Sequence, residues 1–244
     1  MNLLSIGNSF SMDAQRYLHQ IAEADGIALD NYDIYIGGCS LSRHYQNMLS
    51  EKQVYGLGMH GKDVGFSVSL KDALLNREWD AVTIQQASHL SPDYQTYQPY
   101  LHKLVEYIRL CVPHAKIYIH QTWAYEQDSA RLNQMMGYAD QKDMFCDLKK
   151  AYGQAVEEEK LDGILPSGAV FQALLSKGVE KIHRDTFHAR LGLGRYALGL
   201  LWYKVLTGND IYGNTFCNFD EPVTDEEIAA AKESVEEVYA EYYR

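Results

Sequence analysis

The stretch Leu3-Leu4-Ser5-Ile6-Gly7-Asn8-Ser9-Phe10 decides how the rest of this chain is interpreted. Its first four residues are mostly apolar and predict a short buried strand, and the glycine that follows turns the chain into a helix. A serine at such a junction lies at the carboxyl end of the strand, where the N–H groups of the helix start favour negative charge. Ser9 is therefore a candidate nucleophile, which needs a base from elsewhere in the chain.

Short apolar runs alternate with helical patterns along the whole chain. After the first run, the patterns predict strands over residues 33–36, 79–84, 116–120 and 163–166, with helices between them. Such alternation is typical of a parallel sheet that is covered by helices on both faces. We predict an α/β fold in one domain over residues 1–244: a three-layer α/β/α sandwich with a flavodoxin-like parallel sheet of about five strands.

Three further segments carry local signals. Glycines at positions 56, 58, 61 and 65 indicate a surface loop over residues 52–65, with a short strand over residues 66–70. Ser91-Pro92 predicts the start of a helix that runs to about Cys111. Thr224, followed by three acidic residues, predicts a capped helix at the end of the chain.

Composition argues against two classes of partner. With 22 basic and 33 acidic residues, the formal net charge is −11, which opposes binding to nucleic-acid phosphates and to anionic lipid. No run approaches the ~18 apolar residues that a spanning helix needs, and the first residues lack the basic and apolar regions of a secretion signal. We therefore expect a cytoplasmic protein with no nucleic-acid and no membrane partner.

The sequence gives no support for a metal or an organic cofactor. The four cysteines lie far apart without a CxxC pair, which favours reduced thiols over a zinc site or a disulfide framework. No HxH or HExxH spacing occurs among the nine histidines, and no glycine-rich phosphate motif occurs either. We therefore expect no metal and no cofactor.

The candidate base lies late in the chain, in Asp185-Thr186-Phe187-His188. An aspartate three residues before a histidine on a turn can accept from one imidazole nitrogen and so fix the tautomer. The other nitrogen is then free to take a proton from a serine. His188 is the predicted base for Ser9, and Asp185 is the residue that orients it.

In combination these motifs resemble those of the SGNH, or GDSL-like, hydrolase superfamily. Gly7-Asn8-Ser9-Phe10 is similar to the first block of that superfamily, with Asn8 where the better-known version has aspartate. Gly38 matches the second block, whose glycine N–H serves the oxyanion hole, and Asp185 with His188 matches the last block. Within the superfamily the chain resembles a bacterial branch, the DUF4886-like proteins. The resemblance implies an oxyanion hole that includes the N–H groups of Ser9 and Gly38.

The third block departs from the superfamily pattern. Where the superfamily carries Gly-x-Asn-Asp, with the asparagine as an oxyanion donor, this chain has Ile84-Gln85-Gln86-Ala87-Ser88. A glutamine amide has the same donor chemistry on a longer arm, so either glutamine could replace the asparagine, with help from Ser88. Strand alternation does not settle which glutamine faces the site, and the resemblance favours Gln85.

Further polar and aromatic residues follow the predicted strands and are candidates for the walls of a pocket. They are Asn8, Gln86, Ser88, His89, His120, Trp123 and Tyr125. Trp and Tyr rings are suited to packing against a sugar or an acyl group, although they can equally close the top of a sheet.

These patterns lead to one preferred function and two alternatives. We expect a serine esterase that hydrolyses small acyl esters, acetyl esters of carbohydrates included, through a Ser9-His188-Asp185 triad. Its partner is then a small-molecule or carbohydrate ester. One alternative is a non-catalytic carbohydrate-binding or scaffold protein on the same fold, which the altered third block favours. The other is a lipase or thioesterase with the same mechanism.

Overall fold

A computed structural model describes residues 1–244 and has a seven-stranded sheet at its centre. The sheet has the order β4-β3-β2-β1-β5-β6-β7. Its strands are β1 (Asn2–Gly7), β2 (Asp30–Tyr35), β3 (Tyr55–Met59), β4 (Lys62–Val68), β5 (Ala81–Ile84), β6 (Lys116–Gln121) and β7 (Gly163–Pro166). The five strands from β2 to β7 in this order run parallel, and β3 and β4 are antiparallel to their neighbours.

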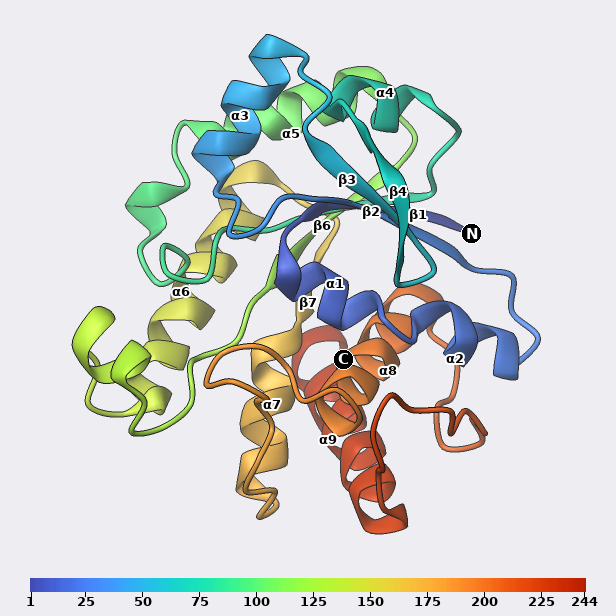
Figure 1. The fold of residues 1–244 in the computed structure, drawn as a ribbon, viewed down its shortest axis with the longest axis vertical. Helices are drawn as coiled ribbons and strands as arrows, with labels where there is room; N and C mark the ends of the chain where they lie inside the picture. Colours follow the sequence, from blue (N-terminus) through green and yellow to red (C-terminus); the bar gives the residue numbers. More distant parts are fainter.

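Helices cover both faces of the sheet, which confirms the predicted three-layer α/β/α arrangement (Figure 1). One face carries α3 (Leu41–Ser50), α4 (Leu70–Leu75), α5 (Tyr100–Cys111) and α6 (Gln141–Glu159). The other face carries α1 (Ser9–Gln15), α2 (Leu18–Ala24), α7 (Ser167–Ser176), α8 (Leu193–Thr207) and α9 (Asp225–Tyr243). A 3₁₀ helix, Tyr94–Thr96, and a π-helix, Arg131–Met135, lie in the connections.

The handedness of the connections explains this division. The chain moves from β1 to β2 in one direction across the sheet, and from β5 through β6 to β7 in the opposite direction. Because crossovers between parallel strands are right-handed, the two directions place their helices on opposite faces. In Figure 1, helices α1 and α2 accordingly lie below β1 and β2, and α5 lies above them.

The sheet has seven strands rather than about five because the predicted loop over residues 52–65 is a β-hairpin. Strand β3 pairs with β2, and Gly58 lies opposite Asp33. A Cβ at position 58 would lie 2.2 Å from Oδ1 of Asp33, so the glycine makes room for a buried side chain on the next strand. Glycine is unfavourable in strands, and a tertiary contact overrides that preference here.

Two helix boundaries test the local signals. The helix predicted from Ser91 begins only at Tyr100, after Pro99, because the proline ring disfavours helical geometry at the residue before it. At the last helix the prediction is confirmed: Thr224 and Glu227 form a capping box, with the Glu227 N–H donating to Thr224 at 3.2 Å.

None of the helices is long and apolar enough to cross a membrane.

The parallel strands bring several predicted site residues to one edge of the sheet. Register pairs Gly7 with Tyr35, and Ile6 with Ile84, so the loops after these strands leave the sheet side by side. In folds of this class, ligands bind outside the carboxyl ends of the strands.

Candidate active site

Ser9 is the first residue of α1 and is separated from the end of β1 by Asn8 alone. The side chain of Asn8 caps the helix: its Oδ1 accepts from the Phe10 N–H at 3.1 Å, and its Nδ2 donates to the Cys39 carbonyl at 3.2 Å. Gly7 permits this tight junction, because a Cβ there would lie 2.3 Å from Oγ of Ser11. The local sequence thus fixes Ser9 at the carboxyl edge of the sheet with its side chain partly exposed.

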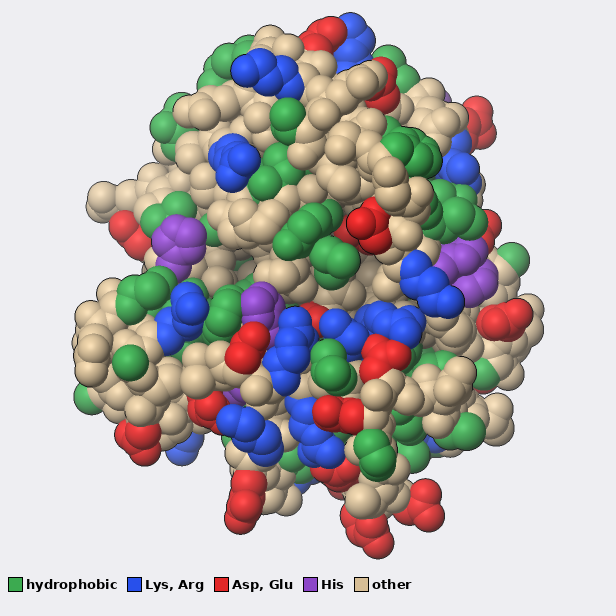
Figure 2. All heavy atoms as spheres, viewed as in Figure 1, with side chains coloured by type: hydrophobic (Ala, Val, Ile, Leu, Met, Phe, Trp, Pro, Cys, Tyr) green, Lys and Arg blue, Asp and Glu red, His purple; other side chains and the backbone are tan.

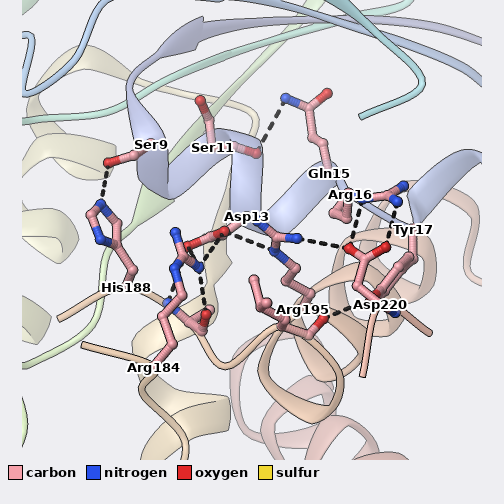
Figure 3. Close-up of polar contacts among 12 residues, drawn as sticks. Ser9, Ser11, Asp13, Gln15, Arg16, Tyr17, Arg184, His188, Arg195 and Asp220 are labelled. Atoms are coloured by element: carbon pink, nitrogen blue, oxygen red, sulfur yellow. Dashed lines mark hydrogen bonds and ion pairs between the residues drawn. The ribbon is translucent and has the colours of Figure 1, made fainter. Parts of the chain in front are cut away.

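A chain of hydrogen bonds links Ser9 to the late aspartate and histidine. The Ser9 hydroxyl lies 2.9 Å from Nε2 of His188, and Nδ1 of His188 lies 2.8 Å from Oδ2 of Asp185. The second carboxylate oxygen of Asp185 accepts from the His188 backbone N–H at 2.9 Å. Figure 3 shows the Ser9 hydroxyl and the His188 ring pointing toward one another. In this order an aspartate orients an imidazole that faces a serine hydroxyl.

The turn that carries His188 is held by its own backbone and by one tryptophan. The Arg184 N–H donates to the His188 carbonyl at 3.0 Å, and the indole N–H of Trp123 donates to the Phe187 carbonyl at 2.7 Å. Thr186 has a φ of 75°, in the left-handed region that β-branched residues seldom adopt. Such strain persists where the surrounding structure enforces it.

The electrostatics of the turn favour an ionised Asp185. Partial burial raises the pKa of Asp185, but the hydrogen bonds from the ring and the N–H of His188, together with the charges of His188 and Arg184, lower it more. The resulting pKa lies below the ordinary value of an aspartate. Asp185 is therefore a carboxylate at neutral pH, as an acceptor for the imidazole must be.

Helix α1 also anchors the turn through Asp13, which the sequence analysis did not single out. The Asp13 carboxylate is buried and accepts from Arg184 at 2.9 Å, from Arg195 at 2.9 Å and from the Ala189 N–H at 3.1 Å. Arg195 continues to Asp220 at 2.8 Å. In Figure 3, Ser9 and Asp13 project from the same helix toward the same turn. One helix thus positions both the hydroxyl and the segment that carries the imidazole.

Ser9 and His188 line a cavity of about 320 Å³. Its twelve lining residues are Asn8, Ser9, Phe10, Tyr35, Gly37, Gly38, Ser88, His89, Tyr125, Arg131, Phe187 and His188. Figure 2 shows hydrophobic and histidine side chains along the middle of the face seen in Figure 1, with basic and acidic side chains intermixed below them. The cavity combines aromatic rings with a few polar groups, which is typical of small-molecule sites.

Gly38 lies on the wall of this cavity, as its predicted role requires. It is exposed and has a φ of 60°, a conformation that suits glycine. Its N–H donates to no acceptor within the protein. A free N–H on the wall of a cavity can hold an anionic oxygen of a ligand.

The two glutamines after β5 do not face the cavity, contrary to their predicted places in the oxyanion hole and the pocket. Gln85 is buried behind Asn8: its Nε2 donates to Oδ1 of Asn8 at 2.9 Å, and its Oε1 accepts from Nδ1 of His120 at 3.1 Å. The Gln86 amide is also engaged, with the Leu41 N–H at 3.0 Å on one side and the Thr96 carbonyl at 3.0 Å on the other. In this geometry Gln85 holds the Asn8 side chain, and Gln86 connects the start of α3 at Leu41 to the 3₁₀ helix at Thr96.

The remaining predicted pocket residues divide into two groups. Ser88, His89 and Tyr125 line the cavity, with Ser88 and Tyr125 joined through their hydroxyls at 2.9 Å. His120 and Trp123 are fully buried behind it, which corrects their predicted place in the pocket. Burial lowers the pKa of His120 to about 3, so this ring is neutral. Trp123 supports the cavity wall indirectly, because it packs on the lining residue Phe10 with ring centroids 4.1 Å apart.

One cluster elsewhere has side chains of the metal-binding type. His19, Asp30 and His60 offer ligand atoms within 4.8 Å of one another, at the opposite edge of the sheet from Ser9. The two imidazole rings stack in parallel, with centroids 3.5 Å apart and planes 5° apart. Nδ1 of His19 lies 2.7 Å from the Leu29 carbonyl, which can only accept, so this nitrogen is a donor and has no lone pair for a metal. The cluster is therefore better described as a hydrogen-bonded contact, with His60 2.8 Å from Asp30.

The sequence motifs did not identify several residues in and around the cavity. Tyr35 and Gly37 lie just before the predicted oxyanion glycine, Gly38, so their place beside the cavity follows once β2 is known to end at Tyr35. Asp13 lies four residues after Ser9, on the same side of a helix, which is a spacing that sequence alone could have exploited. Arg131 comes from a distant segment and reaches the cavity only through the tertiary fold.

Comparisons with known proteins show the family to which this chain belongs. Residues 2–237 match the model of a family described as "Domain of unknown function (DUF4886)". A DUF4886 family protein from Bacteroides uniformis has a solved structure that is 31% identical, covers 98% of this chain and 95% of that chain, and gives a TM-score of 0.92. Among curated proteins, none matches the sequence.

More distant structures share the fold. A proposed SGNH hydrolase from Slackia heliotrinireducens is 21% identical, over 84% of this chain and 98% of that chain, with a TM-score of 0.62. Est24, a carbohydrate acetylesterase from Sinorhizobium meliloti, is 14% identical, over 85% of this chain and 98% of that chain, with a TM-score of 0.52. At these identities the likeness establishes the SGNH hydrolase fold.

Proposed function

We propose that this chain, which belongs to the DUF4886 family, is a serine esterase that hydrolyses small acyl esters. One observation carries the proposal: Ser9, His188 and Asp185 form a continuous hydrogen-bonded chain at the wall of a cavity. A serine hydroxyl is a weak nucleophile until an adjacent base takes its proton, and this arrangement supplies that base.

The reaction then has two steps. Nε2 of His188 takes the proton of Ser9 while Oγ attacks the ester carbonyl carbon, and the imidazolium is stabilised by the Asp185 carboxylate. His188 returns the proton to the leaving alcohol, which leaves an acyl group on Ser9. A water molecule, deprotonated by His188, attacks this acyl-enzyme and releases the acid.

The negative oxygen of each tetrahedral intermediate is held by backbone groups in this proposal. The N–H of Gly38 is free to donate, and the N–H of Ser9, at the first position of a helix, has no acceptor within the helix. Loss of one such donor typically costs on the order of 10² to 10³ in rate. Gln85 contributes indirectly, because it holds the Asn8 side chain that caps α1.

The cavity supports a small substrate. Its volume of about 320 Å³ is suited to a short acyl group with part of the alcohol. The partly exposed aromatic walls, Tyr35 and Phe187, are suited to contact with a sugar ring. We therefore favour acetyl esters of carbohydrates as the substrate class, and the shared fold with a carbohydrate acetylesterase supports this choice.

Two measurements test the proposal. Turnover of 4-nitrophenyl acetate should vanish in Ser9→Ala and persist in Ser11→Ala, a neighbouring serine that does not line the cavity. A fluorophosphonate probe should add its mass at Ser9 in the wild-type protein. Activity that survives Ser9→Ala would exclude Ser9 as the nucleophile.

The same experiments separate the alternatives. A wild-type protein that neither turns over esters nor takes the probe would favour a non-catalytic binding protein on this fold. A series of 4-nitrophenyl esters of increasing acyl length distinguishes a small-ester hydrolase, with the highest kcat/KM at two to four carbons, from a lipase, with a preference for long chains. Acyl thioesters tested in parallel identify a thioesterase.

A further inference from the structure

The charges on the walls of the cavity differ from those of the protein as a whole. The chain has 33 acidic and 22 basic residues, yet no aspartate or glutamate lines the cavity. Arg131 is the one lining residue with a permanent charge. A local positive charge in a strongly acidic protein marks a place where an anionic group of a ligand is favoured.

Arg131 is held in place by aromatic rings rather than by a carboxylate. Its guanidinium carbon lies 3.8 Å from the ring centroid of Phe187 and 5.6 Å from that of Tyr125. Stacking on a ring fixes the guanidinium plane and leaves its N–H edge free. The residue begins a π-helix, Arg131–Met135, a form that occurs frequently at functional sites.

The guanidinium has no acidic partner in the protein. No ion pair joins Arg131 to a carboxylate within 4.0 Å; its guanidinium reaches the sulfur of Met135 at 4.0 Å and lies beside the Tyr125 side chain. In contrast, Arg184 and Arg195 each bind Asp13 at 2.9 Å. Arg131 thus retains nearly all of its donors for a ligand.

We propose that Arg131 binds a carboxylate on the substrate, so that the preferred ester is anionic. The proposal rests on the esterase function proposed above and specifies its substrate class. Planar guanidinium and planar carboxylate form two parallel hydrogen bonds, which fix orientation as well as affinity. The Arg131 guanidinium lies over Phe187, which directly precedes His188. A carboxylate bound by this guanidinium is therefore held at the same wall as the candidate base.

A matched pair of substrates tests the proposal. We compare 4-acetoxybenzoate, which is anionic, with its neutral methyl ester, and measure the ratio of kcat/KM values for acetyl hydrolysis. The wild-type protein should favour the anionic ester, and Arg131→Gln should lower this ratio roughly tenfold or more through loss of charge-assisted hydrogen bonds. Arg43→Gln, the same substitution at an exposed arginine outside the cavity, should keep the wild-type ratio.

Two further arms make the outcomes decisive. A ratio that is the same in the wild type and in Arg131→Gln would overturn the proposal and leave Arg131 a packing residue for Phe187. A stronger preference for 4-acetoxybenzenesulfonate than for the benzoate would overturn the assignment to a carboxylate. Calorimetric binding of 4-acetoxybenzoate to Ser9→Ala, lost when Arg131→Gln is added, supports the anion site even if the esterase function fails.

Discussion

The Asp13 carboxylate accepts a hydrogen bond at 3.1 Å from the N–H of Ala189, the residue that follows His188. Asp13 lies on α1, four residues after Ser9, so the helix that presents the hydroxyl also anchors the turn that presents the imidazole. The 2.9 Å approach of Ser9 to His188 therefore depends on a buried ionic contact that touches neither reacting atom. Asp13 is a positioning residue, and the consequences of that role can be measured.

We expect Asp13→Asn to lower kcat for 4-nitrophenyl acetate by roughly tenfold or more, with little change in KM, because small misplacements of a catalytic group are costly. Asp220→Asn is the matched control, since Asp220 binds Arg16 and Arg195 but not the turn. Equal losses of kcat in the two variants would mean that the whole ionic network acts only on stability. Melting temperatures of both variants provide the comparison.

Replacement of the orienting carboxylate should act on the base itself. In Asp185→Asn, an amide can donate to the imidazole and favour the wrong tautomer, so we expect kcat to fall by roughly 10²- to 10⁴-fold. Thermal unfolding should change little, because the Asp185 side chain is about half exposed, at 46%. A variant with near wild-type kcat would remove Asp185 from the proposed mechanism.

Gln85 and Asn8 should behave as one unit. Gln85 donates to Oδ1 of Asn8, the same atom that caps α1, so both side chains act through the position of Ser9. We expect the double variant Asn8→Ala/Gln85→Ala to lose no more kcat/KM than the worse single variant, because interacting residues are non-additive. Losses that multiply would indicate that Gln85 contacts the substrate independently.

Asp33 should make stability depend on pH. Burial, with a smaller contribution from the Asp63 charge, raises the pKa of Asp33 to about 7, and no hydrogen bond reaches its Oδ2. A carboxyl whose pKa is higher in the folded state binds more protons there, so its destabilising effect develops as pH rises from about 4 to about 7. Once the pH is well above about 7, the carboxylate is fully ionised in both states, and its destabilising effect no longer grows.

We therefore expect Asp33→Asn to stabilise the protein more at pH 8 than at pH 4. The gain in the free energy of unfolding over the wild type should be larger at pH 8 by on the order of 2 to 4 kcal/mol. Urea denaturation at the two pH values measures this difference. Asp63→Asn, at an exposed carboxylate whose charge adds only the smaller contribution to the pKa of Asp33, should give a much smaller effect in the same direction. A pH-independent effect of Asp33→Asn would show that Asp33 is protonated, or hydrated, throughout.

The parallel part of the sheet was predictable because its strands carry their own pattern. Most of the parallel strands contain a short apolar run, and the helices between them have helical periodicity, so the three layers follow from local information. The β3–β4 hairpin was not predictable in this way. Gly58 leaves room for the Asp33 side chain, and this contact forms only when β2 and β3 are paired. The sequence of the hairpin alone therefore gives no sign of it.

The site residues likewise fall into those that a local motif predicts and those that only the tertiary fold brings together. Ser9, Gly38 and the Asp185/His188 pair lie in short motifs whose chemistry is recognisable without a structure. The direction of the Gln85 side chain was not recognisable, since strand alternation leaves open which residue faces outward where a strand ends. Arg131 is 122 positions from Ser9, and no local pattern connects a lone arginine in that segment to the cavity.

The short helix α1 has a mechanical consequence. Its seven residues carry the nucleophile at one end and the anchor of the base near the other, so a displacement of the helix against the sheet moves both together. A displacement of this kind leaves the separation of the two reacting side chains unchanged. Activity measured against temperature should decline with the breaking of the Asp13 contacts rather than with the loosening of the sheet edge.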